Sequence, residues 1–378
     1  MTRLTTDATT YGGVPADRFA LVKNASSGHF SAVDLAAGEV VADVGSGRYP
    51  HTATFHPDGR HAYLLYLSSA HLEVLDLPTL EPTATVDDLG TAPVGSALTP
   101  DGDYLFVGTM GDLPGGDGSG VVAHRIGDDA VPERVGSRPL GQCAGMQLGP
   151  DGLLYVALKH RDEVVALTPD ADLDVLARYP VGTGPHDLYP VPGTDLLAVN
   201  NADAGVASVV DTGQGTVTNV ETGENPHGIA FAYGETGRFA VFPAREDTRV
   251  AAVDVDALAA GAEPDTRFVD VGTTTGFAAS TPDGRYIVVD SYDASHVTIV
   301  ETASMEVAGR VDVGGEPLHV VFSRDGSECY VGNMATSSLA VLDTASLATG
   351  QPDAVTLARR IEGLGEQPSG IFTPEVDG

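Results

Sequence analysis

The chain has 378 residues, and 53 acidic against 20 basic residues give a formal net charge of −33 at neutral pH. This balance argues strongly against a nucleic-acid partner, because phosphate binding requires clustered Lys and Arg. It also argues against an anionic membrane surface. Hydrophobic residues make up 42% of the chain, which suits a large core and not a disordered protein.

The first residues carry no targeting signal. Met1 to Gly13 lacks the apolar segment of a signal peptide, and no apolar run approaches the roughly 20 residues of a membrane span. We therefore expect a cytoplasmic protein with no membrane partner. Residues 1–17 are predicted to form an N-terminal arm, and residues 18–378 a single domain.

The predicted elements begin with three strands between Arg18 and Gly45. After them the chain repeats one unit: a Pro-containing approach to a strand, a turn of the Pro-Asp-Gly type, and three more strands. Pro presets φ in such a turn, Asp bonds its own backbone, and Gly supplies the positive φ. The turns lie at 57–59, 100–102, 150–152, 282–284 and, with Arg in place of Pro, 324–326.

The approach to the first strand of the unit occurs eight times, at intervals of 41 to 51 residues. The copies start at Pro50, Pro93, Cys143, Pro185, Pro226, Thr275, Pro317 and Pro368. Four strands in each such interval predict an all-β propeller of eight four-stranded blades. The last strand, Ser369 to Thr373, is predicted to pair with the first three strands and close the ring. Seven blades is the alternative, if Gly111 to Pro139 is only an insertion.

Short motifs resemble those of the YVTN-repeat family of β-propellers. They include Tyr330-Val331-Gly332-Asn333 and Pro226-His227-Gly228-Ile229, and the resemblance covers nearly the whole chain. It implies a propeller fold. It leaves function open, because this group includes lactonase-like enzymes, lyases, haem or metal binders and scaffolds.

The histidines concentrate on one predicted face of the propeller. His51, His186 and His227 each follow Pro at the start of an innermost strand, and His319 is one residue later. Four more histidines fall in or beside a second set of loops on the same face: His29, His71, His160 and His296. His56 and His61 flank a turn on the opposite face.

Imidazole is the commonest transition-metal ligand. We therefore predict that His51, His186, His227 and His319 bind a transition metal on the propeller axis, with Cu or Fe favoured and Zn or Ni as alternatives. Asp187 next to His186 is a candidate for orienting a ring nitrogen. A proton-switching site for an apolar ligand and a structural ring of histidines remain as alternatives.

These residues favour a metal-dependent enzyme that acts on a small organic molecule, with redox chemistry preferred. His29, His71, His160 and His296 would be acid/base or substrate-orienting groups at the rim. Lys159 and Arg161 would bind a substrate carboxylate. The alternatives are a non-redox lyase or lactone hydrolase that uses a histidine as acid/base, and a non-catalytic propeller that binds a ligand, haem or a protein. No other cofactor is predicted. A closed ring needs no partner to cover strand edges, so a monomer is expected.

The acid excess predicts a response to salt. Only two of the basic residues are lysines, which fits either a salt-adapted surface or the Arg bias of a high-GC genome. If the surface is salt-adapted, molar KCl should raise the melting temperature, because salt screens repulsion between carboxylates. Thermal denaturation across a KCl series checks this, and a constant melting temperature would favour the genomic explanation.

Overall fold

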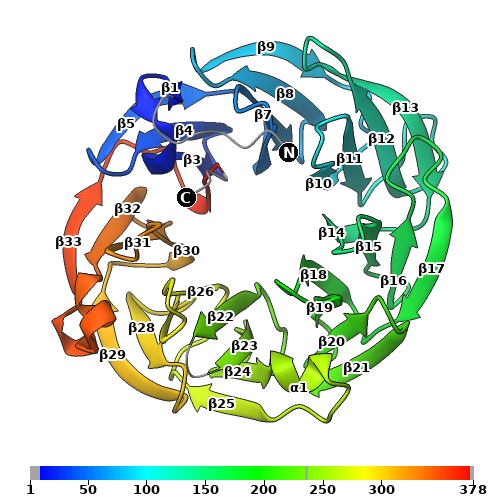
Figure 1. Ribbon diagram of the computed structural model, residues 1–378. Coiled ribbons are helices and arrows are strands. Elements are labelled where there is room, and N and C mark those ends of the chain that lie inside the picture. Colours follow the sequence, from blue (N-terminus) through cyan, green and yellow to red (C-terminus); the bar gives the residue numbers. More distant parts are fainter. Residues whose placement is uncertain (1–8, 235–236, 375–378) are drawn as a thin grey trace.

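The computed structural model describes residues 9–234 and 237–374 as a ring of eight four-stranded antiparallel sheets around a central axis (Figure 1). We use the word channel for the region around this axis that the innermost strands line. The predicted count of eight blades is confirmed. The segment 111–139 is part of a complete blade, since it supplies the two outer strands of the third sheet.

Each blade has one strand at each of four positions, counted from the axis outwards. The innermost strands are β34 (Pro368–Phe372), β6 (Pro50–Phe55), β10 (Pro93–Leu98), β14 (Cys143–Leu148), β18 (Pro185–Pro190), β22 (Ala230–Gly234), β26 (Ala278–Ser280) and β30 (Pro317–Phe322). The second strands are β3 (Phe19–Asn24), β7 (His61–Tyr66), β11 (Tyr104–Thr109), β15 (Leu154–Leu158), β19 (Leu196–Asn201), β23 (Gly237–Phe242), β27 (Tyr286–Val289) and β31 (Glu328–Asn333).

The two outer positions complete the blades. The third strands are β4 (His29–Asp34), β8 (His71–Asp76), β12 (Gly120–Ile126), β16 (Glu163–Leu167), β20 (Val206–Asp211), β24 (Arg249–Asp254), β28 (His296–Glu301) and β32 (Ser338–Asp343). The outermost strands are β5 (Glu39–Val44), β9 (Glu81–Val86), β13 (Pro132–Pro139), β17 (Val175–Pro180), β21 (Thr216–Glu221), β25 (Thr266–Asp270), β29 (Glu306–Asp312) and β33 (Thr356–Ile361).

Few described elements lie outside the blades. They are the hairpin β1 (Thr10–Tyr11) and β2 (Val14–Pro15), the short helix α1 (Val255–Ala259), and the 3-10 turns η1 (Ala16–Arg18), η2 (Ala345–Thr349) and η3 (Pro352–Ala354). Within the predicted arm, the Tyr11 ring packs edge-on against Phe19 at a centroid distance of 5.2 Å. Among the described helices, none is long and apolar enough to cross a membrane.

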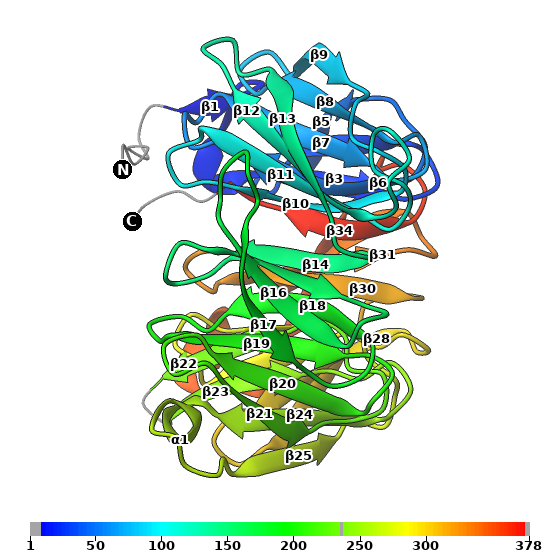
Figure 2. The same cartoon turned by 90° about the vertical axis from the view of Figure 1, so that its right-hand side faces the viewer.

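The strand order defines two faces of the ring. We call the face where the innermost strands begin the entry face, and the face that carries the Pro-Asp-Gly turns the turn face. In the edge-on view of Figure 2 the strands run between these faces, and β1 and α1 lie on the same one. Both elements belong to the turn face, because α1 directly follows the third strand of the sixth blade.

The core is divided among the blade boundaries. Eight clusters of buried apolar residues each join two neighbouring blades. The second and third strands are buried almost throughout, as in β7 and β8, whereas outermost strands such as β5 alternate between exposed and half-buried positions. This burial explains the continuous apolar runs in the sequence, because a strand covered on both sides gains by burying every side chain.

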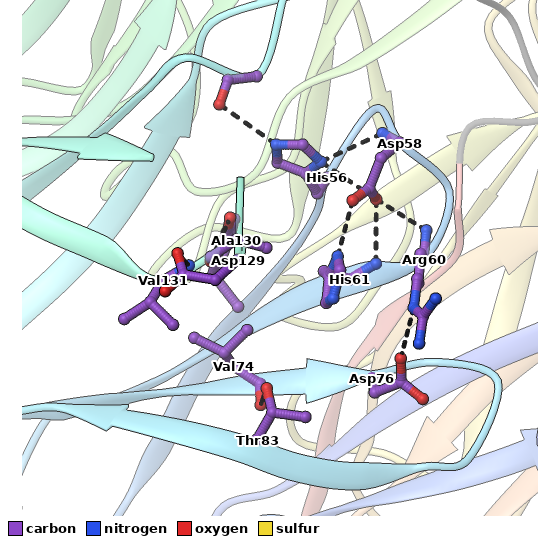
Figure 3. Close-up of polar contacts among 12 residues, drawn as sticks. His56, Asp58, Arg60, His61, Val74, Asp76, Thr83, Asp129, Ala130 and Val131 are labelled. Carbon is purple, nitrogen blue, oxygen red and sulfur yellow. Dashed lines mark hydrogen bonds and ion pairs between the residues drawn. The ribbon is translucent and has the colours of Figure 1, made fainter. Parts of the chain in front are cut away.

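A turn-face cluster shows how the Pro-Asp-Gly turns are fixed (Figure 3). Asp58 accepts hydrogen bonds from the backbone N–H groups of Arg60 at 2.7 Å and His61 at 3.1 Å, and its other oxygen lies 2.7 Å from Nδ1 of His61. With its proton on Nε2, His56 donates to the carbonyl oxygen of Gly102 in the next blade, at 3.2 Å. His56 and His61 therefore have structural contacts far from the entry face.

The ring is closed as predicted, by pairing β34 with β3. The register joins Val22 to Ile371 and Lys23 to Gly370. Ile371 is only 4% exposed and belongs to the cluster that joins the eighth blade to the first. The closing strand thus satisfies the edge of β3 and contributes to the boundary core.

Deleting all residues after Gly365 should destabilise the protein by about 4 kcal/mol or more, because the packed side chains of Pro368, Ile371 and Phe372 and several backbone hydrogen bonds are lost. We expect the melting temperature to fall by roughly 5 °C or more. Truncation after Pro374, which keeps β34, is the matched control. Equal melting curves for the two truncated proteins would contradict this role of β34.

Candidate functional site in the channel

The start of each innermost strand has an irregular backbone. The residue before the Pro has a left-handed φ, as at Tyr49 (58°) and Glu316 (56°). The next residues form β-bulges at 50–52, 185–188 and 318–320. A bulge leaves an extra residue unpaired and redirects its side chain. Because of these bulges, His51, His186 and His319 have no paired residue on the neighbouring second strand.

Asp187 connects two of the histidines across a blade boundary. Its Oδ1 lies 3.2 Å from Nδ1 of His186, and its Oδ2 lies 3.6 Å from Nδ1 of His227. Oδ2 also accepts the backbone N–H of Gly228 at 3.0 Å. Among the described residues, these two histidines and Asp187 form the one group of three or more metal-ligating side chains, with ligand atoms within 4.8 Å of one another.

Asp187 favours one tautomer for both rings. Burial alone would raise the pKa of Asp187, but electrostatic interaction with the imidazoles of His227 and His186 and the hydrogen bonds from His186 and Gly228 hold that pKa well below its usual value. An ionised carboxylate beside two Nδ1 atoms attracts the ring proton to Nδ1. The Nε2 lone pairs of His186 and His227 then remain as candidate metal donors.

Four rings form a continuous arc around the channel. Successive centroids are 4.9 Å apart for His186 and His227, 5.2 Å for His227 and Phe277, and 4.9 Å for Phe277 and His319. We call these four residues the aromatic arc. They belong to the fifth, sixth, seventh and eighth blades in turn, so the arc covers half of the ring.

Asp290 fixes the far end of the arc. It accepts the backbone N–H groups of Gly276 at 2.6 Å and Phe277 at 3.0 Å on one oxygen, and that of His319 at 3.3 Å on the other. His319 has a φ of 70°, which costs energy for a residue with a Cβ and is held here by that contact. Burial raises the pKa of Asp290 to about 6, although the three N–H groups and Arg245 act in the opposite direction.

Lys23 reaches the channel from the second strand of the first blade. Its backbone partner on β34 is Gly370, and a Cβ on that glycine would lie 3.3 Å from Cε of Lys23. The lysine side chain thus passes the innermost strand where that strand has no side chain. Burial, followed by the charge of Arg245, lowers the pKa of Lys23 to about 8.

Arg245 lies between the sixth and seventh blades. Its backbone N–H bonds the carbonyl of Asn225 at 2.9 Å, and its guanidinium lies 5.2 Å from the ring centroid of Tyr292. The Nε atom is buried without a hydrogen-bond partner among the described residues. Arg245 therefore adds a partly desolvated cation to the loops of the entry face.

Three of the histidines are held neutral. Burial and then the charge of Lys23 lower the pKa of His51 to about 3 and of His319 to about 4. Burial also lowers the pKa of His227 to about 4, and Arg245 adds to this effect while Asp187 opposes it. A neutral imidazole is the form that binds a metal or acts as a base.

The four predicted metal ligands are not gathered equally. His186 and His227 lie together with Asp187, whereas His51 and His319 are outside that three-residue group. His51 lies on β6, an innermost strand like β18, which carries His186. The Nδ1 atoms of His51 and His319 are buried and have no hydrogen-bond partner among the described residues.

The predicted rim residues share the entry face but lie further out. His29, His71 and His296 begin third strands, about 10 Å from the innermost strand of their blade. His29 contacts the Ser27 carbonyl at 3.2 Å, and the His71 ring stacks on Tyr66 at 4.6 Å. The structure does not bring these rings together.

The remaining predicted rim residues lie in one turn, between β15 and β16. His160 and Arg161 are exposed, and Lys159 is half-buried. Cys143, at the start of β14, is 1% exposed, and its thiol contacts the Gly120 carbonyl at 3.1 Å. Burial raises the pKa of Cys143 to about 12, and this residue does not belong to the His186–Asp187–His227 group.

Four residues of the channel were not predicted as site residues from the sequence: Lys23, Arg245, Phe277 and Asp290. One signal was available for Lys23, since the predicted closure pairs it with a glycine. Asp290 directly follows β27. At the corresponding position, the second strands of the first, fifth and eighth blades end in an asparagine: Asn24, Asn201 and Asn333. No periodic signal marks Arg245, because it lies in an irregular loop.

Comparison with known proteins supports the fold. The chain matches no protein-family model and no curated protein. Among solved structures, dihydro-haem d1 dehydrogenase NirN in complex with DHE has a TM-score of 0.78 at 19% identity, over 95% of this chain and 76% of that chain.

Two other solved structures are similar over nearly their whole length. Apo AztD from Citrobacter koseri has a TM-score of 0.63 at 13% identity, over 93% of this chain and 96% of that chain. A protein from Bacteroides fragilis described as a candidate 6-phosphogluconolactonase has a TM-score of 0.62 at 15% identity, over 95% and 99%. At these identities the likeness shows that the chain is a β-propeller, without assigning a function.

Proposed function

We propose that the protein is a metal-dependent enzyme that acts on a small organic molecule in the propeller channel. The observation that carries this proposal is the His186–Asp187–His227 group, in which one half-buried carboxylate contacts two imidazoles from neighbouring blades. A carboxylate behind metal-binding histidines fixes their tautomer and makes them better donors.

The donor set fits a transition metal. Imidazole suits Cu, Fe, Zn and Ni, and two histidines leave coordination positions for a substrate. The buried, unpartnered Nδ1 atoms of His51 and His319 also fit an additional group in the channel, because a buried polar atom without a partner is costly. Cu or Fe is favoured, and such a metal would supply redox chemistry.

The protein's own residues would prepare the channel for that chemistry. Asp187 would hold His186 and His227 in the metal-binding tautomer, and Asp290 would position His319 through its backbone. His51 and His319 would remain neutral and able to accept a proton from a substrate. The same residues would serve a non-redox lyase or lactone hydrolase if the metal acts as a Lewis acid.

Metal titration of single variants tests the proposal. His186→Ala and His227→Ala should each abolish stoichiometric binding of Cu or Fe, because each removes a ligand. Asp187→Asn should weaken binding by roughly 10–100-fold, as expected for a group that orients a ligand. Calorimetric titration and elemental analysis of the untagged protein measure both effects.

His61→Ala is the matched control, since His61 bonds Asp58 on the turn face. It should keep full metal binding even if it melts at a lower temperature. Circular dichroism establishes that each variant is folded. The metal proposal fails if folded His186→Ala and His227→Ala proteins bind metal as tightly as the wild type.

A second candidate function is binding of a tetrapyrrole. The aromatic arc and the two unpartnered imidazoles favour it, because flat macrocycles stack on rings and haem iron takes an axial histidine. The likeness to NirN in complex with DHE is consistent with this candidate but covers the fold alone.

Titration with haemin separates the two candidates. A tetrapyrrole site predicts a saturable shift of the Soret band that His51→Ala or His319→Ala removes, because one of these rings would be the axial ligand. His61→Ala should retain the shift. A Soret band that stays at the position of free haemin, or one that survives in both channel variants, would reject this candidate.

A further inference from the structure

We propose that Asn200 and Gly228 are positioning residues for the His186–Asp187–His227 group, and that they connect this group to the aromatic arc. The role of the group in metal binding rests on the proposed function. The positioning itself rests on hydrogen bonds and close contacts that join three neighbouring blades, and it can be measured in the metal-free protein.

The sixth blade begins its innermost strand late. β6, β18 and β30 each start at a Pro and include their histidine, whereas β22 starts only at Ala230. His227 and Gly228 therefore lie outside a strand. Gly228 is buried, and its N–H and C=O have no backbone hydrogen-bond partner among the described residues. Buried backbone groups in such a segment need partners from elsewhere.

Two side chains of the fifth blade supply these partners. Oδ2 of Asp187 accepts the N–H of Gly228 at 3.0 Å, and Nδ2 of Asn200 donates to the carbonyl oxygen of Gly228 at 2.8 Å. Asp187 lies on β18, and Asn200 lies on the adjacent β19. The peptide groups on both sides of the Gly228 Cα are thus held by the blade that carries His186.

The held N–H group determines how the carboxylate of Asp187 is oriented. The same Oδ2 lies 3.6 Å from Nδ1 of His227, while Oδ1 lies 3.2 Å from Nδ1 of His186. If Gly228 rotated away, Oδ2 would lose its hydrogen-bond donor, and the carboxylate could turn away from His227. Glycine has the freest backbone of all residues, so the bond from Asn200 is what restrains it.

Gly228 also contacts the seventh blade. Its φ is 64°, and a Cβ on this residue would lie 2.7 Å from the carbonyl oxygen of Gly276 and 2.8 Å from Cδ1 of Phe277. The left-handed backbone and the close approach both require glycine here. The ring of Phe277 follows that of His227 in the aromatic arc. Gly228 therefore sets the spacing between the histidine pair and the rest of the arc.

The amide of Asn200 makes one hydrogen bond within the described parts of the chain. The residue is 0% exposed, its Oδ1 has no partner there, and its Nδ2 donates to Gly228. Asn201 is equally buried and also has an Oδ1 without a partner. Its Nδ2 instead donates within the fifth blade, to the Val206 carbonyl and the Ser208 hydroxyl. The two neighbours thus differ in whether their amide reaches the sixth blade.

The experiment compares Asn200→Leu with Asn201→Leu, which is the matched control. Both replace a buried amide by an apolar side chain of similar size, but only Asn200→Leu removes the bond to Gly228. The first measurement is heteronuclear NMR of the imidazole nitrogens in metal-free, full-length protein at about pH 8, where imidazole is neutral. His186→Ala and His227→Ala identify the signals of the two rings.

We expect the His227 ring to carry its proton on Nδ1 in the wild type and in Asn201→Leu. In Asn200→Leu the same ring should become a mixture of tautomers, because Asp187 is no longer held against it. The second measurement is calorimetric titration with Cu²⁺. Asn200→Leu should bind about tenfold more weakly than the wild type, at the lower end of the effect of groups that orient a ligand. Asn201→Leu should bind as the wild type does.

Circular dichroism establishes folding, and Asn200→Ala takes the place of Asn200→Leu if the larger side chain prevents it. The inference is overturned if the His227 tautomer is unchanged in the folded Asn200 variant, if Asn201→Leu alters it equally, or if Cu²⁺ binds the Asn200 variant as tightly as the wild type. Failure of both Asn200 variants to fold beside a folded Asn201→Leu would show a purely structural role and would also overturn it. A wild type that binds no Cu²⁺, with the tautomer change present, would reject the metal proposal and support the positioning role.

Discussion

The pairing of β34 with β3 is the contact on which both the ring and its channel depend. It joins segments about 340 residues apart, as the Ser26–Gln367 hydrogen bond also shows. It completes the eighth boundary cluster, and it sets Lys23 opposite Gly370. If the register were shifted by one residue, every side chain of β34 would change sides, and Lys23 would meet a side chain in place of a gap.

The channel residues depend on a second constraint, which is that an innermost strand has no neighbour on its axial side. Bulges are tolerated there because no ladder is lost on that side, and they redirect His51, His186 and His319. Two carboxylates at blade boundaries, the half-buried Asp187 and the buried Asp290, then fix the ring and backbone positions. The side chains of the site thus come from loops and strand starts, while the rigid neighbouring blades fix their positions.

The sequence was sufficient for the fold because each blade repeats the same signals. Pro-Asp-Gly turns, buried apolar strands and the split first blade predicted the eight sheets and the closure, and the structure confirms them. The candidate site was predictable only where it followed the repeat, as for His186 and His227. The surroundings of Lys23 and Arg245 are made by residues of other blades, and the sequence of a single repeat unit contains no information about those contacts. Phe277 and Asp290 became relevant only through contacts with neighbouring blades.

The distribution of the core has a consequence for how the site forms in time. Each apolar cluster joins adjacent blades, so boundaries between the second and eighth blades consist of contacts that are local in sequence. During synthesis these boundaries can assemble one after another as an open arc. The first blade has to wait for residues 368–372, and closing so distant a contact is slow. The gap at Gly370 that the Lys23 side chain passes is therefore formed in the final step of folding, so that an incomplete chain presents the channel histidines on an open arc.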